Sequence, residues 1–123
     1  AATFLAVAAA FKRMRNILEQ AVDRDEDVAE SVDAALLKED AERQLNETGA
    51  VVASEVESLA MRREYGAALE LIAGLRPVVD AFFDRVMVMA PEPEIRANRL
   101  ALVGRTVQDF SRIADFSEMV TAG

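Results

Sequence analysis

Three consecutive residues, Pro91-Glu92-Pro93, divide the last part of the chain into two amphipathic helical patterns. Proline disfavours helix at its own position and at the residue before it, so two prolines this close together impose a break. Before the break we expect a helix over residues 77–89, and after it a helix from residues 92–94 to about 115. The expected buried positions are Val79, Phe82, Phe83 and Val86 on the first, and Ile95, Leu102, Val103, Thr106, Phe110 and Ile113 on the second.

Few residues elsewhere would interrupt a helix. With 5 glycines and 3 prolines among 123 residues, and with abundant alanine, the composition favours helix almost throughout. We expect further helices at about 2–19, 39–61 and 65–75, with an acidic linker near 23–33. Short connections then predict an all-α, antiparallel bundle of about five helices in a single domain over residues 1–123. The chain starts without Met, so we expect a fragment of a longer protein.

The net charge of −8 is distributed unevenly along the chain. Residues 19–47 hold eleven acidic and three basic side chains, which gives −8, whereas residues 1–18 hold three basic side chains and no acid. Phosphate contacts supply most nonspecific affinity for nucleic acids, so the whole chain is expected to be a poor nonspecific binder. The first helix nevertheless offers a local basic segment.

Several kinds of chemistry lack the residues that they require. Histidine and cysteine are absent, which removes the usual catalytic bases, thiol nucleophiles and zinc ligands. The glycines are isolated, so no glycine-rich phosphate-binding loop is present. No apolar run reaches the roughly 18 residues of a membrane span. We therefore expect no catalytic residue, metal, cofactor or membrane contact in this segment.

One charged residue falls inside an apolar stripe. Arg99 lies among the core positions of the last helix, and a guanidinium in a core requires a charged partner. The nearest acids by topology are Asp80 and Asp84, one turn apart on the preceding helix. We expect Arg99 to be largely buried and bonded to one of them as a structural ion pair.

Four stretches carry a resemblance to a known family. They are FLAVAAAFKRMRNIL near the start, DAFFDRVMVM before the proline break, EIRANRLALV after it, and FSRIADFS near the end. Together they closely resemble the C-terminal part of the beta subunit of the bacterial two-subunit glycyl-tRNA synthetase. The resemblance covers most of the chain and is weakest over residues 20–60, where only helicity and spacing agree.

The resemblance implies a helical anticodon-binding domain related to that of arginyl-tRNA synthetase. It implies a role in the cytoplasm as part of glycine–tRNA ligase, with tRNA(Gly), the remainder of the beta subunit and the alpha subunit as partners in an alpha2beta2 assembly. Glycine activation, with ATP and Mg, is expected elsewhere in that complex. The anticodon would be read through bases splayed out of the loop.

Candidate RNA contacts follow from charge and from the family motif. Lys12, Arg13 and Asn16 lie away from the apolar stripe of the first helix and combine charge with a base-reading amide. Further candidates are Arg85, Arg96, Arg105 and Arg112. For each of these arginines a solvated helix face is an equal alternative, and Arg105 is spaced for an i,i+4 ion pair with Asp109.

Aromatic residues add little to this expectation. Phe4, Phe11, Phe82, Phe83 and Phe110 are all assigned to core stripes, which leaves Tyr65 and Phe116 as stacking candidates. The alternative function is a protein docking or dimerisation module without RNA contact. An exposed apolar patch of several hundred Å² would favour docking, and a clustered Arg, Lys and Asn face would favour RNA.

Overall fold

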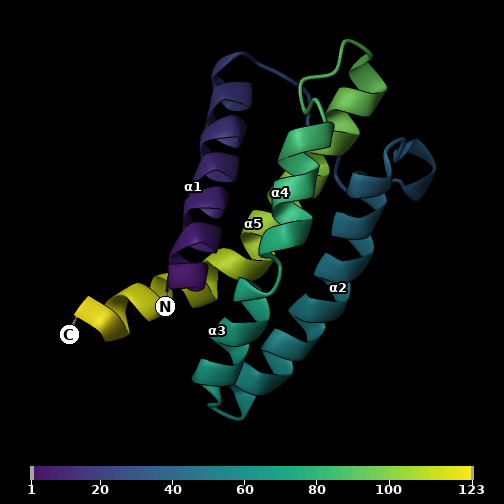
Figure 1. Ribbon diagram of the computed structural model, residues 1–123. Helices are drawn as coiled ribbons and strands as arrows, with labels where there is room; N and C mark the ends of the chain where they lie inside the picture. Colours follow the sequence, from purple (N-terminus) through teal and green to yellow (C-terminus); the bar gives the residue numbers. More distant parts are fainter. Residues whose placement is uncertain (1, 123) are drawn as a thin grey trace.

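The computed structural model describes the backbone of residues 2–122 and the side chains of residues 8–110. Within these residues the chain is all-α, as predicted. It consists, in order, of α1 (Ala2–Asp23), a 3-10 turn η1 (Ala34–Leu36), α2 (Asp40–Met61), α3 (Tyr65–Ala73), α4 (Arg76–Arg85) and α5 (Pro93–Ala122). Figure 1 shows α1 and α2 on opposite sides, with α4 in front of α5 between them.

Two helices end on a residue in the left-handed region. After α1, Asp25 has φ 57°, and the amide of Glu26 donates to the Ala21 carbonyl at 2.9 Å. After α2, Arg63 has φ 61°, and the amide of Glu64 donates to the Leu59 carbonyl at 2.8 Å. These bonds satisfy carbonyls that the last helical turn leaves free, in the pattern usually built with glycine. They place the end of α1 four residues beyond the expected position.

The helix before the prolines is shorter than predicted. α4 ends at Arg85 and not at Met89, because Val86 adopts extended backbone with φ −112° and ψ 123°. Val86 and Val88 are buried while Met87 between them is 65% exposed. This alternation is the period-two pattern of an extended segment, which β-branched valines favour. Helical spacing instead predicts that both valines belong to the helix over residues 77–89, and this prediction is wrong.

The core lies where α5 meets the other helices. α5 packs against α1, α2 and α3, and α4 packs against α1 and α2. The rings of Phe11 on α1 and Phe110 on α5 stack with centroids 5.8 Å apart, and both side chains are fully buried. Fully buried side chains also include Met14, Leu45, Ile72, Val79, Phe82, Leu100, Leu102 and Val103. The side chains of Phe4, Ile113 and Phe116 lie outside the described residues.

Candidate nucleic-acid interface

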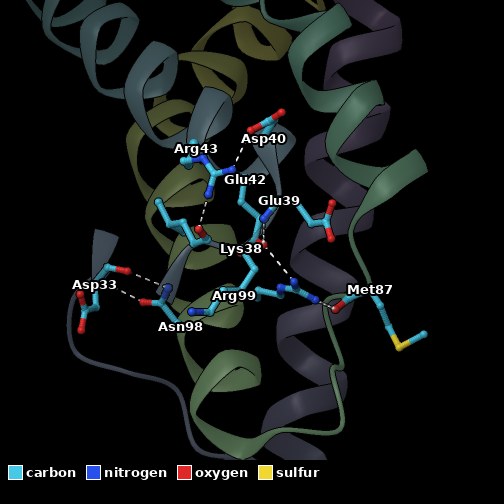
Figure 2. A network of polar contacts seen from close by, with 10 residues as sticks. Asp33, Lys38, Glu39, Asp40, Glu42, Arg43, Met87, Asn98 and Arg99 are labelled. Atoms are coloured by element: carbon cyan, nitrogen blue, oxygen red, sulfur yellow. Dashed lines mark hydrogen bonds and ion pairs between the residues drawn. The ribbon is translucent and has the colours of Figure 1, made fainter. Parts of the chain in front are cut away.

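Arg99 is buried, as predicted, but its predicted partners are wrong. Its Nη2 lies 2.9 Å from Oε1 of Glu42 on α2, and its Nη1 donates to the Met87 carbonyl at 2.7 Å (Figure 2). Both charged side chains are out of solvent, with 9% of the Arg99 side chain and 0% of the Glu42 side chain exposed. The pair joins α2, α5 and the extended segment after α4.

Asp80 and Asp84 cannot serve this role because both lie on the solvent side of α4. The buried face of α4 consists of Val78, Val79 and Phe82. Asp80 is exposed and pairs instead with Arg76, one turn earlier, at 3.5 Å. The sequence did contain a signal for the true partner, since Glu42 shares a helical stripe with Leu45, Gly49 and Val56, all of them buried.

Glu42 also closes the start of α2. Its Oε1 accepts hydrogen bonds from the amides of Lys38 at 3.2 Å and Glu39 at 3.0 Å, as part of a capping box. One carboxylate oxygen therefore receives two backbone donors and one guanidinium. Its other oxygen, Oε2, has no partner among the described residues.

Arg96, predicted as an RNA contact, is bonded within the protein. Its Nε lies 2.9 Å from Oε2 of Glu26 in the acidic linker, and its Nη1 donates to the Ala90 carbonyl at 3.0 Å. Only about a quarter of either side chain in this ion pair is exposed. The geometry gives Arg96 a structural use in holding the linker against the start of α5.

Asn98 reinforces the same attachment. Although its side chain is polar, Asn98 is only 1% exposed. Its Oδ1 accepts from the Asp33 amide at 2.7 Å and its Nδ2 donates to the Asp33 carbonyl at 3.1 Å (Figure 2). The amide of Ala29 also donates to the Ala97 carbonyl at 3.2 Å. The acidic linker is thus fastened along the first turns of α5.

Arg105 is likewise bonded within the fold. Its Nη1 and Nη2 donate to the side-chain and backbone oxygens of Asn46 on α2, at 2.6 and 3.1 Å. Its Nε lies 4.0 Å from Asp109, as the i,i+4 spacing predicts. Burial raises the pKa of Asp109 above its ordinary value, the Arg105 charge opposes that rise, and the charge of Glu57 adds to it.

The candidates on α1 are placed differently. Lys12, Arg13 and Asn16 are exposed, and none has a hydrogen bond or ion pair to the side chains that the structure describes. The Arg13 guanidinium carbon lies 4.2 Å from the centroid of the Phe83 ring on α4. Arg85, at the end of α4, is exposed and equally without such a partner. The side chain of Arg112 lies outside the described residues.

A hollow of about 190 Å³ opens beside this face of α1. It lies between the second half of α1 and the end of α4 with the extended segment after it. Its lining residues are Arg13, Ile17, Gln20, Ala21, Arg24, Phe83, Val86, Val88 and Met89. Phe83 was assigned to the core, yet it is only half-buried and forms part of this wall.

None of the described helices is long and apolar enough to cross a membrane. Across the same part of the chain, no group of three or more His, Cys, Asp or Glu side chains is placed to hold a metal ion.

The described residues form an all-α bundle whose first helix exposes Lys12, Arg13 and Asn16. Its family is shown by sequence. The chain belongs to the DALR anticodon binding domain family, whose model matches residues 7–116.

Curated relatives give the wider context. The chain is similar to the glycine–tRNA ligase beta subunit of Acidobacterium capsulatum, with 52% identity over 97% of this chain and 17% of that protein. It is also similar to the beta subunits of Vibrio cholerae, at 45% identity over 91% of this chain, and of Marinobacter nauticus, at 42% over 96%. The chain spans only about a sixth of the length of these relatives.

Proposed function

We propose that this chain is the anticodon-binding domain of a glycine–tRNA ligase beta subunit and binds the anticodon loop of tRNA(Gly) through α1. One observation carries the choice of surface. Arg96, Arg99 and Arg105 on α5 are engaged by oxygen atoms of the protein itself, at 2.6 to 3.1 Å. Among the described side chains, Lys12 and Arg13 of α1 have no such oxygen partner, so they remain available to an external anion.

The chemistry of α1 suits a single-stranded loop. Glycine codons begin with GG, so the anticodons of glycine tRNAs share two cytosines. Bases of this kind are read through hydrogen bonds to their exposed edges and through stacking, while phosphates are met by cations. Lys12 and Arg13 provide charge, and Asn16, one turn from Lys12, provides an amide that both donates and accepts.

Glycine activation belongs, in this proposal, to other parts of the enzyme. The chain has no histidine or cysteine and no glycine-rich loop that would cradle the phosphates of ATP. We therefore assign ATP and Mg to the alpha subunit and the remainder of the beta subunit, in an alpha2beta2 assembly in the cytoplasm. The role of this domain would be to hold the anticodon while the distant end of the tRNA is charged.

The test is a double substitution, Lys12→Ala with Arg13→Ala, in the full-length ligase. Affinity for tRNA(Gly) should fall, and the dependence of log K on log salt should weaken by about 1.4, since each lost phosphate contact on a single strand contributes about 0.7. A matched control removes two exposed arginines, Arg62 and Arg63, at the turn between α2 and α3. Equal losses in both variants, or no loss in the first, would contradict the assignment of α1.

Docking to another protein is the competing function. The exposed large apolar side chains among the described residues are Val22, Val28, Val51, Met61 and Met87. They are spread over α1, the linker, α2 and the segment after α4, and do not gather on one element. This distribution favours the RNA-binding function over a docking surface.

A further inference from the structure

The hollow beside α1, at about 190 Å³, is large enough for a single base. Its apolar lining includes Ile17 of α1 and Val86, Val88 and Met89 of the extended segment. Its polar lining includes Gln20 of α1 and Arg24, which directly follows α1, and both are exposed. An apolar wall with a few polar groups on the rim is the usual construction of a small-ligand pocket.

Arg13 and Phe83 add a stacking layer at the edge of the hollow. The guanidinium lies 4.2 Å from the ring centroid, close enough for a cation–π contact. Unpaired bases stack on aromatic rings and on arginine planes. Because Phe83 is fixed by the packing of α4 and Arg13 lies over it, the layer is present before any ligand arrives.

Arg24 is the lining residue best suited to distinguish one base from another. It follows the last residue of α1, is exposed, and has no ion pair within the described residues. Its sequence neighbours are Asp23 and Asp25, both exposed acids, and these disfavour a phosphate at the same place. A cationic donor with acids beside it is better suited to a neutral base edge than to the RNA backbone.

We propose that this hollow binds one of the two shared anticodon cytosines, with Arg24 donating to its O2 and N3 and Gln20 accepting from its N4 amino group. The assignment rests on the function proposed above. An arginine can only donate hydrogen bonds, so it can pair with the edge of cytosine, whose N3 carries a lone pair. It rejects uracil, whose N3 carries a hydrogen. The neighbouring phosphates then lie toward Lys12 and Asn16, further along α1.

The test measures binding of the full-length ligase to synthetic anticodon stem-loops of tRNA(Gly). In the parent loop each shared cytosine is replaced by uracil in turn. One of these replacements should weaken binding to the unmodified enzyme about tenfold or more. The substitution Arg24→Gln should remove most of that preference, because a glutamine amide can turn to pair with either base.

Two further variants separate base reading from general affinity. Arg63→Gln removes an exposed arginine at the turn between α2 and α3 that neither lines the hollow nor belongs to the candidate RNA contacts, and it should leave the preference for cytosine unchanged. Phe83→Leu keeps an apolar side chain but removes the ring, so it should weaken binding to all loops by a similar factor. Preserved circular dichroism and subunit assembly would establish that each variant is folded.

The outcomes distinguish failure of this inference from failure of the proposed function. If the unmodified enzyme prefers cytosine and Arg24→Gln keeps the full preference, the base is read elsewhere and the inference is wrong. If the unmodified enzyme shows no preference at either position, anticodon reading by this domain is wrong as well. If Arg24→Gln and Phe83→Leu disrupt subunit assembly while RNA binding persists, the hollow is a protein docking site and the inference is overturned.

Discussion

The buried ion pair between Glu42 and Arg99 is expected to be the polar contact on which the fold depends most. Glu42→Gln is the appropriate perturbation because it preserves the size of the side chain. The amide oxygen can still accept from the Lys38 and Glu39 amides, which lie 3.2 and 3.0 Å from the present oxygen. What the substitution removes is the charge opposite a guanidinium whose side chain is 9% exposed.

The magnitude follows from that burial. Removing one partner of a buried ion pair costs roughly 3–5 kcal/mol, because the remaining charge stays desolvated without compensation. The hydrogen bonds that glutamine keeps place the expected loss of unfolding free energy near the lower end, at about 3 kcal/mol. For a chain of this size each kcal/mol lowers the melting midpoint by about 3–6 °C, so the midpoint should fall by about 10 °C or more.

Urea unfolding followed by far-ultraviolet circular dichroism would measure the effect. Glu47→Gln is the matched control, since Glu47 is an exposed carboxylate on the same helix. Combining Glu42→Gln with Arg99→Met should cost less than the sum of the two single changes, because the double variant leaves no unpaired buried charge. A loss below about 1 kcal/mol for Glu42→Gln, or one equal to that of Glu47→Gln, would refute the reasoning.

Two other substitutions test the polar contacts around α5. Asn98→Ala removes both hydrogen bonds to the backbone of Asp33 and should cost about 1–3 kcal/mol; amide exchange at Asp33 should accelerate, and unchanged exchange would contradict its attachment. Burial raises the pKa of Asp109, so the folded state binds its proton more tightly than the unfolded state does. That contribution to stability is complete below the ordinary pKa of 3.8 and is lost as pH rises through the folded value. Asp109→Asn should therefore flatten the decline of stability over this range in pH-dependent unfolding, and a steeper decline would show the sign to be wrong.

Much of the fold could be predicted from periodicity and from helix-breaking residues. Pro93 begins α5, and the tight corner after Met61 separates α2 from α3. These positions depend on local chemistry, which a sequence displays directly. The end of α4 could not be predicted in this way. The choice between helix and extended backbone at Val86 depends on which side chains become buried in the assembled bundle. In this extended segment the Met87 carbonyl also accepts a hydrogen bond from Arg99, twelve residues further along the chain.

The candidate site could be predicted only in part, since exposure and pairing are properties of the assembled bundle. Periodicity placed Lys12, Arg13 and Asn16 on an outward face, where they are found. Arg99 and Asn98 show the limit of the same method. The prediction for Arg99 considered only the acids of the neighbouring helix, yet the partners of Arg99 and Asn98 are Glu42 and Asp33, which lie 57 and 65 residues away along the chain. The apolar stripe of α2 marks Glu42 as a buried residue, but no local pattern pairs it with Arg99.

The contacts between residues 19–47 and α5 explain why this segment is so acidic. An excess of acids over residues 19–47 argues against RNA binding when charge is counted along the sequence. In the folded chain, Glu26 and Glu42 from this segment neutralise Arg96 and Arg99 at the start of α5, and Asp33 is fastened beside them. The linker is thereby held against α5 by its own ion pairs and hydrogen bonds. Among the described side chains, Lys12 and Arg13 have no hydrogen-bond or ion-pair partner, so a chain with a net charge of −8 can still expose basic residues on α1, the surface proposed here for RNA.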